Sequence, residues 1–213
     1  MENQPKVLVA IPYHKTKNYC LKHALERVQE LTYANKDVLM RWDLGVYGGE
    51  NNVKNQREFF RKTALALDFD YLFFMGVDTI PPADVLERLL KTAEANKIKL
   101  ISGVYFGRSN AENGKPDAAV AWIHELSQTE QTKIFSTMNS LVKVDGAGMD
   151  CVLIHRDVLE KISWLDWPQN DDDYPFYDKA IALGYDVYID TNIQCRHYYN
   201  QDHYCYMAKD SKK

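Results

Sequence analysis

The first 105 residues alternate between short apolar runs and segments of helical periodicity, and this alternation restricts the fold more than any other feature. The first run, KVLVAI, is closed by Pro12, and the most apolar run is YLFFM. Strands that alternate with helices favour a mostly parallel sheet with a ligand crevice at the carboxyl ends of the strands. The expected strands are 6–11, 37–42, 71–75 and 98–104, and the expected helices are 21–31, 54–67 and 85–90.

The second half of the chain has a different pattern, with shorter apolar runs between polar segments. It predicts strands at 118–122, 140–144, 151–154 and 186–190, and a helix at 174–183 that ends at Gly184. The sequence contains no repeat, low-complexity tract or linker. We therefore expect one α/β domain over residues 1–213.

Composition excludes several classes of protein. A net charge of -4 gives no indication of a surface for nucleic acid or an anionic membrane. The six-residue apolar run near the N-terminus is too short for a signal peptide or a transmembrane segment, so we expect a cytoplasmic protein. The four cysteines show no close pairing, as is typical of reduced thiols: Cys20, Cys151, Cys195 and Cys205.

The segment DFDYLFFMGVDTIPP joins a buried strand to an acidic residue and then to a helix start. The strand delivers Asp78 to the edge of the sheet, where a carboxylate faces the crevice. Hard divalent cations such as Mg²⁺ and Mn²⁺ bind carboxylates and bridge them to a diphosphate. Asp is also a favoured helix cap, so the spacing alone leaves a metal ligand and a cap as alternatives.

This hydrophobic strand, DxD-like triplet and I-P-P resemble the metal site of GT-A glycosyltransferases, particularly family 2 and its compact phage and viral relatives. The resemblance implies a GT-A (Rossmann-like) fold, with a mostly parallel central sheet flanked by helices and a smaller mixed β region on the acceptor side. It places Asp78 on the Asp that ligates Mn²⁺ or Mg²⁺. Gly76 replaces the first Asp of the motif, and Gly76 and Val77 would lie beside the donor.

Two further segments resemble the nucleotide-binding part of the family. AIPYH matches its opening strand, and NNVKNQRE resembles the N-x-x-x-R-N region that precedes the DxD helix. An Arg there offers a fork of donors to a phosphate, although a solvated helix face is the alternative. The resemblance implies nucleotide contacts from Pro12, Tyr13, Asp43, Asn52, Asn55 and Arg57, with Asp43 accepting from the base.

The segment VDGAGMDCVLIHRD resembles the small-residue loop and strand near the donor sugar. Gly146, Ala147 and Gly148 would let the backbone approach the sugar closely. An ordinary turn that needs positive φ is the alternative. Asp150 stands where many relatives have a small residue, and the sequence assigns it no role.

Two more segments complete the resemblance. NDDDYPF resembles the ED-x-x-F motif of inverting members, and alignment on Phe176 places Asp173 and then Asp172 as the general base. Helix capping is the other interpretation, because acidic residues are favoured at a helix N-terminus, and both roles can hold because three acids exceed what one cap needs. His197 ends a short strand, where the family often completes its metal site with a His, although a lone His is more often structural.

The resemblance implies transfer of a sugar from a nucleotide-sugar donor, with a UDP-sugar favoured, to the hydroxyl of an acceptor. The acceptor is open between a glycan and a modified nucleic acid such as a hydroxymethylated DNA base. Residues 1–105 would bind the donor and 106–213 the acceptor. The alternatives are a retaining GT-A transferase, a sugar nucleotidyltransferase and a degenerate protein that only binds nucleotide or glycan.

Overall fold

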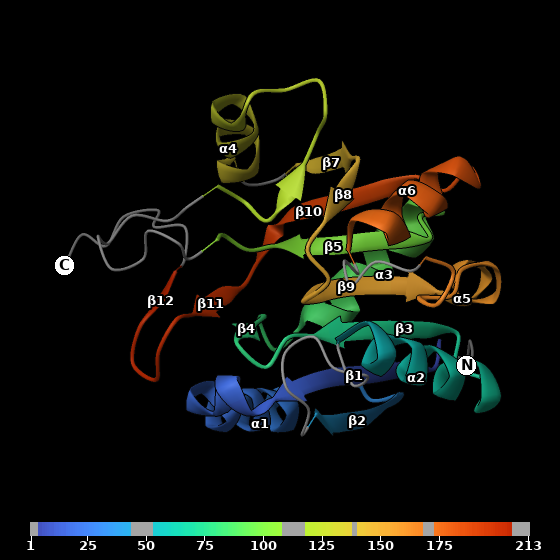
Figure 1. Ribbon diagram of the computed structural model, residues 1–213, viewed down its shortest axis with the longest axis vertical. Helices are drawn as coiled ribbons and strands as arrows, with labels where there is room; N and C mark the ends of the chain where they lie inside the picture. The colour runs from blue at the N-terminus through green and yellow to red at the C-terminus, as the bar shows by residue number, and fades with distance from the viewer. Residues whose placement is uncertain (1–3, 44–52, 108–117, 138–139, 168–172, 206–213) are drawn as a thin grey trace.

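The computed structural model describes residues 4–43, 53–107, 118–137, 140–167 and 173–205, and its centre is a seven-stranded sheet (Figure 1). The strands of this sheet are β1 (Val7–His14), β2 (Lys36–Asp43), β3 (Tyr71–Met75), β5 (Leu100–Val104), β7 (Leu141–Val144), β9 (Cys151–His155) and β10 (Val187–Gln194). Their order is β2-β1-β3-β9-β5-β10-β7. Strands from both halves of the sequence therefore contribute to one sheet.

The sheet is mostly parallel, as expected, but one strand interrupts the parallel run. β1 is parallel to β2 and β3, and β10 is parallel to β5. β9 lies between β3 and β5 and is antiparallel to both, and β7 is antiparallel to β10 at the edge. The amino-terminal end of β9 therefore lies at the edge where the parallel strands have their carboxyl ends.

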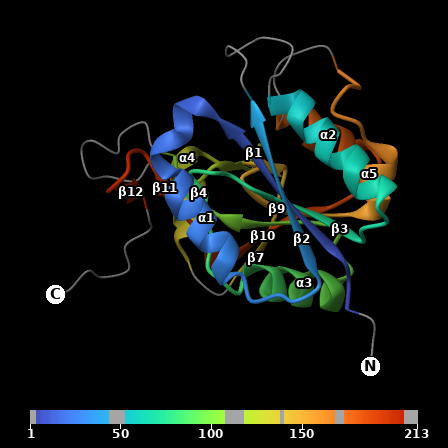
Figure 2. The same cartoon turned by 90° about the horizontal axis from the view of Figure 1, so that it is seen from below.

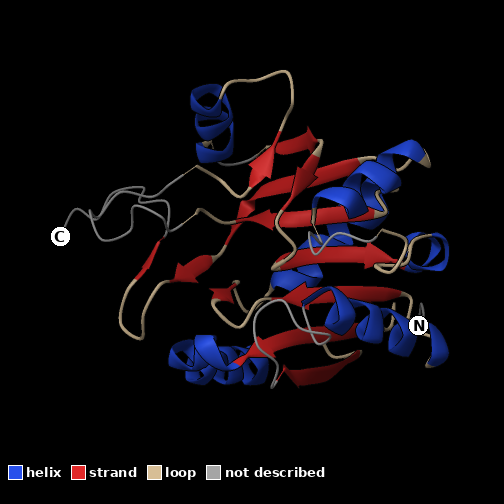
Figure 3. Ribbon diagram, viewed as in Figure 1, coloured by secondary structure: helices blue, strands red, loops and turns tan. Residues whose placement is uncertain are grey.

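Helices cover both faces of the sheet (Figures 2 and 3). α1 (Leu21–Glu30) and α3 (Val85–Asn96) pack on one face, while α2 (Val53–Ala66), α5 (Arg156–Lys161) and α6 (Tyr174–Ala182) pack on the other. Alternate residues of β1 enter the two cores, Leu8 one and Val7 and Val9 the other. The central strands are buried on both faces, which explains their continuous apolar runs.

Two small sheets lie beside the main one. β4 (Thr79–Ile80), β11 (Arg196–Tyr198) and β12 (Tyr204–Cys205) form a three-stranded sheet near the carboxyl ends of the parallel strands, at the left of Figure 1. β6 (Ala121–Trp122) pairs with β8 (Gly146–Ala147). These short strands form the small additional β region that the resemblance implied beside the main sheet.

Several elements differ from the sequence expectation. The first strand continues past Pro12 to His14, because it pairs with β2 as far as Asp43. A 3₁₀ helix, η1 (Lys15–Cys20), follows it. The helix α4 (Gln128–Ser136) was not expected, since Phe135 is its single fully buried residue, although a capping box of Ser127 and Glu130 marks its start. All four cysteines are buried thiols. No helix of the described ranges is long and apolar enough to cross a membrane.

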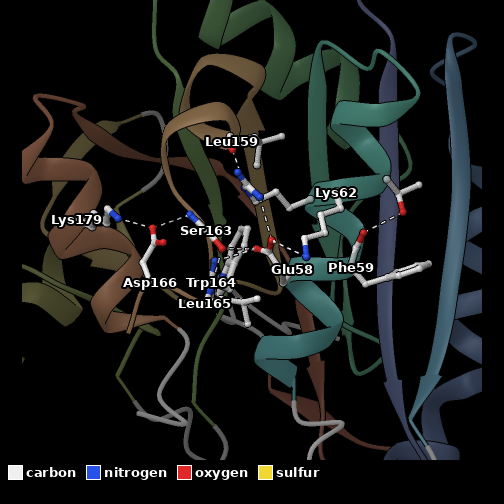
Figure 4. Close-up of polar contacts among 11 residues, drawn as sticks. Glu58, Phe59, Lys62, Leu159, Ser163, Trp164, Leu165, Asp166 and Lys179 are labelled. Atoms are coloured by element: carbon white, nitrogen blue, oxygen red, sulfur yellow. Dashed lines mark hydrogen bonds and ion pairs between the residues drawn. The ribbon is translucent and has the colours of Figure 1, made fainter. Parts of the chain in front are cut away.

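A buried carboxylate joins α2 to the segment between α5 and α6 (Figure 4). Glu58 accepts hydrogen bonds from the Ser163 hydroxyl at 3.0 Å and the Trp164 backbone N–H at 3.1 Å, and pairs with Arg61 at 3.0 Å. In the same segment Asp166 pairs with Lys179 of α6. These contacts tie α6, whose first turn contributes to the site described below, to α2.

We predict that Glu58→Ala lowers the free energy of unfolding by about 3 kcal/mol, because the buried Trp164 N–H and the partly buried Arg61 guanidinium lose this acceptor. Glu160→Ala is the control, since Glu160 pairs with Arg156 at 2.7 Å but its side chain is 52% exposed. The control should lose less than about 0.5 kcal/mol. Urea unfolding of both variants measures the difference, and equal losses would contradict the role given to Glu58.

Candidate active site

Asp78 lies in the turn between β3 and β4, and its side chain is fully buried. The Lys17 ammonium pairs with its Oδ1 at 2.9 Å, and His197 Nε2 lies 3.7 Å from its Oδ2. The N-cap of the following helix α3 is Asp84, not Asp78. The helix-cap alternative for Asp78 is therefore wrong.

His197 reaches Asp78 because β11 pairs with β4, which places His197 opposite Thr79. The ring is buried, and its Nδ1 lies 2.8 Å from the backbone carbonyl oxygen of Phe106. A carbonyl oxygen can only accept, so Nδ1 carries the hydrogen of this bond. In the neutral ring Nε2 then presents its lone pair towards Asp78, which is the usual arrangement of a metal-binding histidine.

A second carboxylate, Asp150, joins this pair. It directly precedes β9, and its backbone carbonyl accepts from the Gly76 N–H at 2.9 Å. One ligand atom each from Asp78, Asp150 and His197 lie within 4.8 Å of one another. The antiparallel direction of β9 thus brings Asp150 to the carboxyl edge of β3.

Gly76 makes room for the Asp150 side chain. A Cβ at position 76 would lie 2.6 Å from Asp150 Cγ and 2.9 Å from its Oδ1. The carboxyl group of Asp150 therefore lies against the space that a side chain at position 76 would need. The chain has no acidic side chain at position 76. The carboxylate of Asp150, which directly precedes β9, lies in the space beside it.

The three side chains suit a divalent cation. Two carboxylate oxygens and an imidazole nitrogen are ligands that Mn²⁺ accepts, and Mg²⁺ accepts the oxygens. Two ligands on one ion at about 2.1 Å can lie no more than roughly 4.2 Å apart. The separations of Asp78, Asp150 and His197 are at most 4.8 Å, so these side chains need to converge only slightly.

The surroundings of Asp78 keep its carboxyl group ionised. Burial opposes ionisation and by itself would raise the pKa, but hydrogen bonds and charge from His197 and Lys17 outweigh it. The pKa of Asp78 is therefore lowered below its usual value. An ionised carboxylate is the form that binds a cation.

Tyr105 connects this cluster to the rest of the site. Its phenol oxygen accepts from the Asp150 N–H at 3.4 Å, and its ring meets the His197 ring edge-on with centroids 5.3 Å apart. Burial raises the pKa of the Tyr105 phenol, and the charges of Asp150 and Asp173 raise it further. The charge of Asp173 therefore affects the same phenol that contacts Asp150 and His197.

Asp173 is held by a buried arginine. The Arg57 guanidinium of α2 donates to Asp173 Oδ1, and the side chain of Asp173 is 30% exposed. Asp173 is the N-cap residue of α6, but its side chain makes no capping hydrogen bond. Asp173 therefore occupies the expected position at the helix N-terminus without a capping hydrogen bond. Arg57, expected beside the nucleotide, pairs with the expected base.

Two glycines of the expected sugar loop are needed for close packing. A Cβ at Gly148 would lie 1.8 Å from the Tyr105 phenol oxygen, and one at Gly146 2.1 Å from the Trp122 ring. Within the described residues, Gly184 is the one glycine with positive φ. The positive-φ alternative for Gly146 and Gly148 is therefore wrong.

The remaining expected residues are spread along the edge of the sheet and its neighbours. Pro12 and Tyr13 lie near the carboxyl end of β1, Asp43 ends β2, and Ala147 lies in β8. Asn55 is half-buried in α2 and Val77 is fully buried. Asn52 and Asp172 lie outside the described residues.

Sequence reasoning missed three residues of the site: Lys17, Tyr105 and Asp150. The sequence sign of Asp150 is its place directly before an apolar run, together with a glycine where the DxD-like triplet lacks an acid. This pattern indicates a site residue only if the direction of β9 in the sheet is known. Lys17 and Tyr105 each follow a strand of the main sheet, which is a weaker sign.

The sequence matches no family model and no curated protein. In structure the chain is similar to protein A197 from STIV, with a TM-score of 0.65 and 18% identity over 95% of this chain and 90% of that one. It is also similar to GalNAc-T7 in a structure with UDP, GalNAc and Mn²⁺, with a TM-score of 0.55 and 11% identity over 95% of this chain. That match covers 45% of the GalNAc-T7 chain. The fold is therefore GT-A-like, as the resemblance implied.

We predict that Gly76→Ala lowers the free energy of unfolding by about 1–3 kcal/mol, because its Cβ overlaps the Asp150 side chain. In an Asp150→Gly background the same change should cost less than about 0.5 kcal/mol, since both the carboxyl group and the Cβ have gone. Urea unfolding in EDTA of the four proteins of this cycle measures the coupling. An equal cost in both backgrounds would show that Asp150 does not fill the space beside Gly76.

Proposed function

We propose that this protein is a metal-dependent glycosyltransferase that transfers a sugar from a nucleoside-diphosphate sugar to an acceptor hydroxyl. One observation carries the proposal: Asp78, Asp150 and His197 converge at the carboxyl edge of a GT-A-like sheet. Ligands bind at this edge in open α/β sheets. The ion would be Mn²⁺ or Mg²⁺, which suits the two carboxylates and the imidazole.

The donor is proposed to be a nucleotide sugar, with a UDP-sugar favoured. GalNAc-T7, which shares the fold at low identity, is described with UDP, GalNAc and Mn²⁺. The nucleotide would lie along the ends of β1 and β2, near Pro12, Tyr13 and Asp43. A divalent cation there would bind the diphosphate and stabilise the negative charge that develops on it as the leaving group.

The proposed transfer needs a base on the acceptor side, and Asp173 is the best-placed carboxylate. Its partial exposure lets an acceptor hydroxyl approach, while the ion pair with Arg57 holds its position. As the acceptor oxygen attacks the anomeric carbon, Asp173 takes the hydroxyl proton and the bond to the diphosphate oxygen breaks. Attack opposite the leaving group inverts the anomeric centre.

The proposed acceptor is either a glycan or a hydroxymethylated base in a nucleic acid. Residues 106–213 would supply most of its contacts, with Tyr174 and Trp122 stacked close to Asp173. A retaining transferase is the second candidate function, because the metal cluster alone does not determine which face is attacked. NMR of the first-formed product separates the two, since retention excludes Asp173 as a direct base.

We predict that Mn²⁺ stimulates release of nucleoside diphosphate from the donor, and that Asp78→Ala lowers this release by at least about 100-fold. The change removes a ligand that lies deepest in the cluster. The control is Asp186→Asn, an exposed residue that pairs with Lys143 on the surface. A coupled assay for nucleoside diphosphate measures turnover, and equal rates in Asp78→Ala and the control would refute the metal site.

We predict that Asp173→Asn lowers kcat by about 10²–10⁴-fold, because the amide cannot accept the acceptor proton. Mn²⁺ affinity should not change, since Asp173 is outside the cluster of Asp78, Asp150 and His197. Asp178→Asn, an exposed position on the same helix, is the matched control and should keep full activity. Steady-state kinetics with isothermal titration of Mn²⁺ tests both, and unchanged kcat would remove Asp173 as the base.

A further inference from the structure

The cluster already contains a cation of the protein itself. Lys17 lies in η1, after the end of β1, and its ammonium is 2.9 Å from Asp78 Oδ1. The side chain of Asp78 is 0% exposed and that of Lys17 is 27% exposed. The buried partner is therefore fixed inside the protein, whereas the lysine reaches it from the surface.

This ion pair has a clear physical reason in the metal-free protein. A buried carboxylate without a counter-charge is strongly destabilising, so Asp78 needs a positive partner at all times. Lys17 is the closer of the two basic groups, because its ammonium lies 2.9 Å from Oδ1 whereas His197 Nε2 lies 3.7 Å from Oδ2. Lys17 supplies the positive charge.

A divalent cation on Asp78 would compete with this ammonium. Both need the same carboxylate, and two positive groups at one carboxylate repel each other strongly where water is excluded. A lysine side chain is flexible and well hydrated, so it can leave a partly exposed position at modest cost. The buried ligands Asp78 and His197 have no such freedom, since strand pairing holds them in place.

We propose that Lys17 occupies the cation position at Asp78 until metal binds, and that the displaced ammonium then pairs with the diphosphate of the donor. The inference rests on the proposed function, since it needs a metal and a diphosphate at this edge. Lys17 is then a positioning residue that couples the binding of the metal ion to the binding of the nucleotide. Metal binds weakly alone and more tightly with nucleotide, and by linkage the nucleotide binds more tightly with metal.

The first test uses Mn²⁺ alone, with free Mn²⁺ measured by electron paramagnetic resonance. Lys17→Met and Lys17→Gln should bind Mn²⁺ about tenfold more tightly than the wild type, because the ion no longer displaces an ion pair. Gln keeps a hydrogen-bond donor but carries no charge. Lys15→Met is the matched control, since Lys15 lies exposed in the same 3₁₀ helix and its loss changes net charge equally.

Thermal unfolding separates competition from a merely structural role. In EDTA the Lys17 variants should be less stable than the wild type, because Asp78 loses its counter-charge. Saturating Mn²⁺ should stabilise these variants more than the wild type, since tighter binding gives a larger shift. A structural role alone predicts the loss in EDTA without the larger gain in Mn²⁺.

The second test measures UDP binding at saturating Mn²⁺ by calorimetry, where Lys17→Met should bind about tenfold more weakly than Lys15→Met. Unchanged UDP affinity would refute transfer of the ammonium to the diphosphate. Equal or weaker Mn²⁺ binding by both Lys17 variants would refute competition and leave the site of Asp78, Asp150 and His197 standing. Absence of Mn²⁺ binding in every variant would instead refute the metal site, and with it the proposed function.

Discussion

The buried carboxylate of Asp78 is the constraint around which the site is arranged. A carboxylate with no exposure costs several kcal/mol of folding free energy unless it is paired. Two parts of the chain surround the carboxylate: η1 supplies Lys17 and β11 supplies His197. The Tyr198 backbone N–H of β11 also donates to the Asp78 backbone carbonyl at 2.7 Å. The small sheet of β4, β11 and β12 makes these contacts possible, because the pairing of β11 with β4 brings His197 next to Asp78.

The direction of β9 determines the second acid of the cluster. A strand parallel to β3 would begin at the opposite edge of the sheet, and the residue before it would lie far from Asp78. Because β9 is antiparallel, Met75 is opposite Cys151 and Gly76 is bonded to Asp150. The space beside the backbone of residue 76 has room for one side chain only. Asp150 fills it, and position 76 is a glycine.

The sequence predicts the layers of this fold well, because buried parallel strands are short continuous apolar runs and amphipathic helices repeat every three to four residues. It also points to Asp78 and His197, through the resemblance to a GT-A metal site, although His197 lies in the middle of β11 and not at the end of a strand. Asp150 could not be predicted in the same way, because its role depends on the direction of β9 and the pairing of distant strands. The helix α4 was missed for a different reason: its sequence has a weak apolar face, and its capping box was the readable sign.

Tyr105 sets the spacing between the two chemical parts of the site. Its phenol accepts from Asp150, its ring contacts His197, and Gly148 has no side chain because the phenol lies where a Cβ would be. The charge of Asp173 acts on the same phenol, and Arg57 fixes Asp173 from α2. Both acidic groups therefore act electrostatically on one buried ring. Under the proposed function, the cluster would hold the diphosphate and Asp173 would take the acceptor proton, and Tyr105 is the residue that connects these two parts.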